Sequence, residues 1–142
     1  MAALIKRRKI TMRSDTVIER VMRTDFLRLL PTTPIREAVA MLGRLQTAAA
    51  PVIDDTGMLV GILTEKDCLR VMLNASYYRQ WDGIVSSYMT VDVRTLPVDL
   101  DYVSAAEEFL ARSHRVYPVV RDGAVVGLLH RSDLFIAILD LA

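Results

Sequence analysis

The chain has 142 residues, of which 52% are hydrophobic, so it can form one compact domain or two small halves that share a core. Its formal charge is +1, from 18 basic and 17 acidic residues, which excludes a global field that would steer it toward nucleic acid or an anionic membrane. No uncharged run exceeds nine residues, whereas a membrane-spanning helix needs about 20 apolar residues. We therefore expect a soluble, cytoplasmic protein without a membrane span.

Residues 1–14 are expected to form a flexible basic arm, because the cluster Lys6-Arg7-Arg8-Lys9 is not followed by the apolar core of a signal peptide. Nucleic acid is not an expected partner, since such binding would depend on this cluster alone. The single cysteine, Cys68, cannot form an intrachain disulfide and is expected to be a small core residue.

The first block of elements covers residues 15–73. Asp15 is expected to cap a short lead-in helix that runs to Val21, and an apolar strand follows at 26–30. Thr33-Pro34 is expected to open a helix in which Ile35, Ala38, Val39, Leu42 and Leu45 form a buried apolar stripe. Strands at 51–53 and 58–63 flank a turn that contains Gly57. A second helix is expected from Thr64 to about Leu73, with Cys68, Leu69 and Met72 facing inward.

Residues 74–87 are expected to link this block to a second one over 88–142. The linker contains Tyr77, Tyr78 and Trp81, which could form a partner surface or could fasten the linker to the core. In the second block we expect strands at 93–96, 118–120 and 124–129, and helices at 101–112 and 131–141.

The two blocks repeat each other. Met22 and Met89, and Pro51 and Pro118, are each 67 positions apart, whereas Asp67 and Asp133 are 66 apart because the hairpin turn is one residue shorter. The unit is therefore β-α-β-β-α, present twice, which predicts an α/β fold with a pseudo-twofold axis and clefts between the halves.

The segment Thr64-Glu65-Lys66-Asp67 lies where a strand meets a helix, and helix N-termini favour phosphate groups. Thr64 and Lys66 could bind phosphate, and the Asp67 carboxylate suits the hydroxyls of a ribose. The same pattern is also a variant of the helix capping box. The second copy, His130-Arg131-Ser132-Asp133, keeps the carboxylate and changes the cap, which suggests that the carboxylate has a role besides capping.

The chain resembles a tandem pair of cystathionine-β-synthase (CBS) domains, the Bateman module. The resemblance covers about residues 16–141, and it is carried by 61–67 and 127–133, each preceded by a Pro-Val strand and a turn glycine. It implies two pseudo-twofold-related repeats packed through their sheets. It also implies clefts for adenosine-containing ligands such as AMP, ADP, ATP or S-adenosylmethionine.

The resemblance also implies which residues line the clefts. The first cleft would use Thr64, Lys66, Asp67, Arg94 and His114. We favour it for a phosphorylated nucleotide, because it keeps the family's threonine, Thr64, and has the two cations Lys66 and Arg94. The weaker second cleft, where His130 replaces serine or threonine, would use Leu27, Thr47, Arg115, His130, Ser132 and Asp133.

The expected function is that of a stand-alone regulatory module that binds an adenosyl ligand and signals to an effector enzyme, transporter or channel. The resemblance implies a homodimer, with helices 101–112 and 131–141 as candidate surfaces. The alternative is a ligand-free structural or dimerisation adaptor. We expect no enzyme, required cofactor or metal site, because the sequence shows no nucleophile-base set and no ligand cluster around its two histidines.

Overall fold

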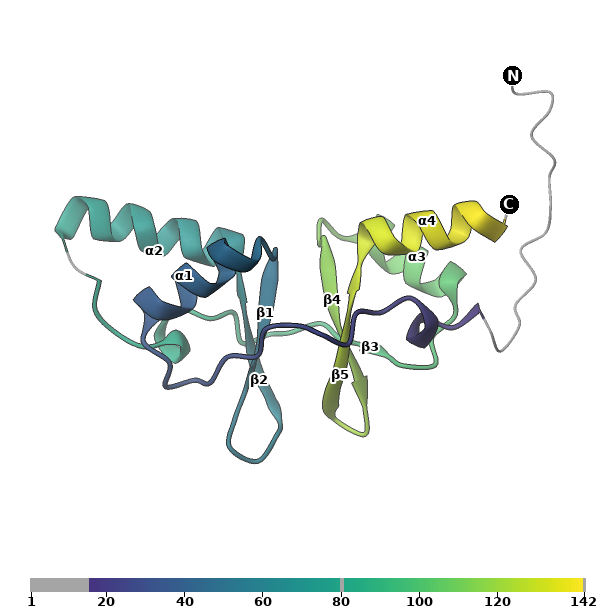
Figure 1. The fold of residues 1–142 in the computed structure, drawn as a ribbon, viewed down its shortest axis with the longest axis horizontal. Coiled ribbons are helices and arrows are strands. Elements are labelled where there is room, and N and C mark those ends of the chain that lie inside the picture. Colours follow the sequence, from purple (N-terminus) through teal and green to yellow (C-terminus); the bar gives the residue numbers. More distant parts are fainter. Residues whose placement is uncertain (1–15, 80, 142) are drawn as a thin grey trace, which may run out of the picture.

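The computed structural model describes residues 16–79 and 81–141, which fold into two similar halves that lie side by side (Figure 1). Each half has an antiparallel hairpin and two helices, so the predicted α/β class and the repeat are confirmed. The expected arm 1–14 and the cap at Asp15 lie outside the described residues. Within the described ranges, no helix is long and apolar enough to cross a bilayer.

The first half contains one hairpin and two helices. Its elements are α1 (Ile35–Leu45), β1 (Ala49–Ile53), β2 (Leu59–Thr64) and α2 (Glu65–Tyr78). The apolar stripe of α1 buries Ile35, Ala38 and Leu42 against the hairpin, as its helical spacing predicts, whereas Leu45 at the end of the helix is 60% exposed and was wrongly placed in the stripe. Helix α2 extends five residues into the segment that we expected to be linker.

The predicted inward face of α2 is partly wrong. Cys68 is buried as expected, but Leu69 is 61% exposed and Met72 is 39% exposed. The buried apolar positions of α2 are Cys68, Val71 and Ala75, which follow helical spacing. The smaller residues therefore pack against the core, and the larger apolar ones point outward.

The second half repeats this arrangement with one additional short strand. Its elements are β3 (Leu96–Pro97), α3 (Tyr102–Ala111), β4 (Val116–Arg121), β5 (Ala124–His130) and α4 (Arg131–Leu141). Strand β3 pairs in parallel with β4, and β4 pairs antiparallel with β5. Both hairpins turn at a glycine with positive φ, +88° at Gly57 and +82° at Gly123, a conformation that favours glycine.

The strands predicted to open each repeat are wrong in extent. Residues 26–30 form only an isolated bridge between Leu29 and Val52, and the strand predicted at 93–96 is reduced to β3. The apolar residues that suggested these strands have another role, because Phe26 and Val93 pack between the two halves. There they contact the buried residues Ala49, Ile62, Val116 and Leu128.

Each half is completed by the short turn that leads into the other repeat. The lead-in forms a 3₁₀ turn, Ile18–Arg20, and Ile18 packs into the core of the second half. The end of the linker forms the matching turn, Val85–Ser87, and Val85 packs into the core of the first half. Figure 1 shows the purple N-terminal segment crossing from one half to the other. The two turns therefore pack in equivalent places in the two halves.

The structure shows one of the two predicted roles for the aromatic residues around the linker. The Trp81 ring is half-buried against the first core, and Tyr88 packs there too while its hydroxyl donates to the Asp82 carbonyl at 2.8 Å. These two residues fasten the linker to the core. Tyr77 and Tyr78 are 76% and 70% exposed, so they remain on the surface.

Candidate ligand-binding site

The N-terminus of α2 is capped by its own side chains. The Asp67 amide donates to Thr64 Oγ1 at 3.1 Å, and the Thr64 amide donates to an Asp67 carboxylate oxygen at 3.0 Å, which completes a capping box. The Glu65 amide donates to the Ala48 carbonyl at 2.9 Å. The first turn therefore offers a ligand mainly the Lys66 amide, for which the described residues show no acceptor.

The Asp67 carboxylate also joins the two halves. It is 5% exposed, and it accepts hydrogen bonds from Arg70 at 2.9 Å and from the Thr90 hydroxyl at 3.2 and 3.4 Å. Thr90 follows the linker and pairs with Ile62 of β2 through two backbone hydrogen bonds of 2.9 Å. The carboxylate thus has a structural role in addition to capping, and it lies behind the cavity wall that Thr64 and Thr90 form.

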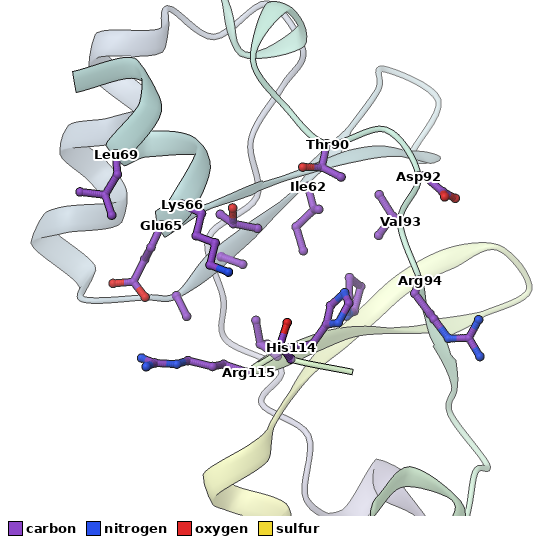
Figure 2. A pocket seen from close by; sticks show the side chains of 16 residues that line it. Ile62, Glu65, Lys66, Leu69, Thr90, Asp92, Val93, Arg94, His114 and Arg115 are labelled. Carbon is purple, nitrogen blue, oxygen red and sulfur yellow. The ribbon is translucent and has the colours of Figure 1, made fainter. Parts of the chain in front are cut away.

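A cavity of about 430 Å³ lies between the halves, in front of the α2 N-terminus (Figure 2). Its volume falls within the range of small-molecule sites. Both repeats and the connection between them contribute to the lining: Ala48, Ala49, Ile62, Thr64, Glu65, Lys66, Leu69, Thr90, Asp92, Val93, Arg94, Ser113, His114, Arg115, Val116 and Pro118.

Four of the five residues predicted for the first cleft line this cavity. They are Thr64, Lys66, Arg94 and His114, and the fifth, Asp67, lies behind Thr64 and Thr90. Arg115, which we assigned to the second cleft, lines the same cavity. Figure 2 shows the Lys66 ammonium group directed into the space that His114 also faces. The described residues provide no ion-pair partner for Lys66 or Arg115.

The Arg94 side chain is bound elsewhere. Its guanidinium donates two hydrogen bonds to Glu108 of α3, at 2.8 and 2.9 Å. This bidentate contact raises the pKa of Arg94 and lowers the pKa of the Glu108 carboxyl. The Glu108 carboxylate therefore offsets the Arg94 charge within the protein.

The His114 imidazole provides a flat, neutral surface. It stacks on the Tyr117 ring with centroids 4.9 Å apart and an interplanar angle of 14°, and the Tyr117 hydroxyl donates to the Glu108 carbonyl at 3.1 Å. Burial lowers the pKa of His114, and the nearby Arg112 and Arg94 lower it further. The ring is therefore mainly uncharged near pH 7.

The residues predicted for the second cleft are placed differently. Asp133 accepts two hydrogen bonds from Arg23, at 2.7 and 3.2 Å, which lower the pKa of its carboxyl. It lines a separate open hollow beside Ile136 and Asp140. Leu27 packs against the first core, and Thr47 donates its hydroxyl to the Ala49 carbonyl at 3.1 Å.

The two remaining residues of that set lie where β5 meets α4. His130 is half-buried, and burial, followed by the nearby Arg23, lowers its pKa. Ser132 is exposed in the first turn of α4. The second site also differs from the first at two positions that our prediction did not use. Arg23 occupies the position equivalent to Thr90, and Phe26 the position equivalent to Val93.

Thr90 and Ser113 are cavity residues that our sequence reasoning missed. A signal for Thr90 was present in the repeat, because it directly follows Met89, whose equivalent Met22 is followed by Arg23. The 67-residue offset therefore assigns Thr90 and Arg23 the same position, and each binds the motif carboxylate of the adjoining repeat unit. Ser113 directly follows the predicted helix 101–112 and had no comparable signal.

Comparisons with known proteins place the chain in a family. The family model for the CBS domain matches residues 18–74 and 85–140. CBSX2 of Arabidopsis thaliana, in a crystal structure with AMP, is 25% identical, with a TM-score of 0.77 over 88% of this chain and 97% of that one.

Curated relatives differ greatly in length. An uncharacterized 17.7-kDa protein of Acidianus ambivalens is 28% identical over 89% of this chain and 75% of its own length. The A-adding tRNA nucleotidyltransferase of Aquifex aeolicus is 31% identical over 96% of this chain, but the match spans only 15% of the enzyme. The two matched segments account for most of this chain, which therefore belongs to the CBS domain family, as a tandem pair of CBS repeats.

Proposed function

We propose that the chain is a regulatory module that binds an adenosine-containing ligand in the cavity between its two repeats. The observation that carries this proposal is the combination of groups around one space of about 430 Å³: apolar walls, a neutral stacked imidazole, and the cations Lys66 and Arg115, for which the described residues provide no ion-pair partner. The AMP bound to CBSX2, a protein of the same family and fold, supports this choice of ligand class.

The proposed orientation of the ligand follows from the chemistry of the walls. Ala48, Ile62 and Val93 form an apolar surface suited to a flat purine. Lys66, with its backbone amide at the α2 N-terminus, and Arg115 are suited to a phosphate. The ribose would lie near Thr64 and Thr90, in front of the Asp67 carboxylate.

Regulation would come from the position of the cavity. Its walls come from both repeats, so a ligand that binds one relative arrangement of the halves better than another would shift the population toward that arrangement. An effector that contacts both halves would detect this shift. We propose an enzyme, transporter or channel as the effector, and the tRNA nucleotidyltransferase match shows that a segment similar to this chain occurs within a larger enzyme.

We also propose that the module forms a homodimer. Large apolar side chains are exposed on the predicted surfaces of α3 and α4: Leu110 at 87%, Phe135 at 66%, Ile136 at 54% and Leu139 at 59%. Exposed apolar patches of this kind are typical of interfaces. Sedimentation-equilibrium ultracentrifugation tests the proposal, because a mass of 16.0 kDa at micromolar concentration would contradict it.

Isothermal titration with AMP, ADP, ATP and S-adenosylmethionine tests ligand binding. Lys66→Ala should weaken binding of a phosphorylated ligand about tenfold or more, because it removes a charged phosphate contact. Ala48→Leu should also weaken binding, because it fills the apolar part of the cavity. Arg44→Ala is a matched control, since it removes an exposed cation from α1, away from the cavity.

Asp67→Ala is a poor test of binding, because Asp67 holds the capping box and the contact to Thr90. If the wild-type protein binds none of the four ligands at millimolar concentration, the nucleotide proposal fails. The alternative function, a ligand-free adaptor, would then be the better account.

A further inference from the structure

The interaction between Arg94 and Glu108 affects the charge that the cavity offers to a ligand. Arg94 belongs to the cavity wall, yet both of its hydrogen bonds in the structure go to Glu108. Figure 2 shows the Arg94 head group directed away from Lys66 and from the centre of the space. Glu108 therefore holds a cation of the cavity wall away from the centre of the cavity.

The balance of charge around the cavity is close to zero when Glu108 is included. The described lining residues contain the cations Lys66, Arg94 and Arg115 and the carboxylates Glu65 and Asp92. Glu108, directly behind Arg94, supplies a further carboxylate, and Arg112 approaches it only at 3.8 Å. Lys66 and Arg115 are left as the cations available to a ligand.

We propose that Glu108 is a specificity-determining residue, which restricts the cavity to adenosine ligands with a single phosphate by keeping Arg94 engaged. This inference rests on the proposed function of the same cavity. A phosphate monoester carries a charge of about −1.5 to −2 near pH 7, which two cations can balance. A triphosphate adds further negative charges, and these require an additional cation that Glu108 withholds.

The test compares the dissociation constants of ATP and AMP by isothermal titration without magnesium. Glu108→Gln keeps the size of the side chain and removes its charge, so Arg94 becomes available to the second and third phosphates. The ratio of the ATP to the AMP dissociation constant should fall about tenfold, as expected for one added charge-assisted contact. Adenosine, which has no phosphate, should bind the variant and the wild-type protein equally.

Two further variants distinguish this effect from a general change in charge or folding. Glu107→Gln removes the neighbouring carboxylate of α3, which is exposed and does not line the cavity, so it should leave the ratio unchanged. The double variant Arg94→Gln/Glu108→Gln should return the ratio to the wild-type value, because the released cation is absent. Circular dichroism should show the same helix content in all of these proteins.

The inference would be overturned if Glu108→Gln left the ratio of the ATP to the AMP dissociation constant unchanged, or if Glu107→Gln lowered this ratio equally. In either case, AMP binding by the wild-type protein would still support the proposed function. A fall in ratio that persists in the double variant would also overturn it, since Arg94 would then have no part in the effect. If the wild-type protein binds neither nucleotide, the inference fails, and the proposed function fails with it only if ADP and S-adenosylmethionine do not bind either.

Discussion

The side chain of Met89 occupies the space in which a side chain on Gly61 would lie. A Cβ atom on Gly61 would overlap the Met89 sulfur and would be 2.9 Å from its Cγ. The second repeat has the same contact, because a Cβ on Gly127 would be 2.8 Å from the Cγ of Met22. The absence of a side chain on each glycine thus leaves room for a methionine. Each methionine directly precedes a residue, Thr90 or Arg23, that forms a backbone bridge with the strand containing the glycine.

Gly61→Ala should therefore lower the free energy of unfolding by about 1–3 kcal/mol, as overpacking of a well-filled site does. Met89→Ala in the same chain should restore part of the loss, because it removes the overlapping atoms. The measurement is urea denaturation of both single variants and the double variant. If the changes in the free energy of unfolding of the two single variants simply add in the double variant, Gly61 and Met89 do not interact, and the glycine is not needed to make room for Met89.

Thr90→Val should destabilise the protein by about 1 kcal/mol, since it removes a hydroxyl that binds a buried carboxylate. Thr90→Ser keeps the hydroxyl and is the matched control. Thermal melting of the two variants should separate them by several degrees. Equal melting temperatures would mean that the Thr90–Asp67 contact contributes nothing to holding the halves together.

The Arg23–Asp133 pair should make a small, pH-dependent contribution to stability. Arg23 lowers the pKa of Asp133 in the folded protein, so this stabilisation is present above the unfolded pKa of about 4 and is lost as the pH falls through the lower folded value. Both side chains are partly exposed, and such pairs contribute about 0–1 kcal/mol.

Asp133→Asn should therefore be less stable than the wild-type protein at pH 7, and the difference should shrink as the pH falls below about 4. Denaturation by urea across this pH range measures it. A stability difference that stays constant down to pH 3 would assign the effect to something other than this ion pair.

Cys68 should be unreactive in the native protein. The thiol is 5% exposed, and burial together with the neighbouring Asp67 and Glu65 carboxylates raises its pKa to about 11. Labelling with a thiol-specific disulfide reagent at pH 8 should be slow without denaturant and fast in concentrated urea. Rapid labelling under native conditions would show that the α2 packing opens far more often than the structure indicates.

The sequence predicted the parts of the fold that depend on local pattern. The apolar spacing of α1, the glycine turns at Gly57 and Gly123 and the capping sequence at Thr64 each specify structure within a few residues, and all were found. The strand at 26–30 was predicted from its apolar residues, but Phe26 is apolar because it packs between the halves. Local pattern cannot separate burial in a strand from burial in an interface.

The same limit applies to the candidate site. The repeat indicated Thr64 and Lys66, which do line the cavity, but the placement of Arg115 there and the engagement of Arg94 with Glu108 depend on how the halves meet. Neither the 67-residue offset nor the local motif contains that information. The exchange of Ile18 and Val85 between the halves was likewise absent from any local signal.

A crystal structure of the protein grown with AMP would test the central claim most directly. We predict that AMP lies in the cavity between the halves, with its phosphate near Lys66 and Arg115 and its base against Ala48 and Ile62. An empty cavity at saturating AMP, or AMP bound only beside Asp133 and Arg23, would contradict the account.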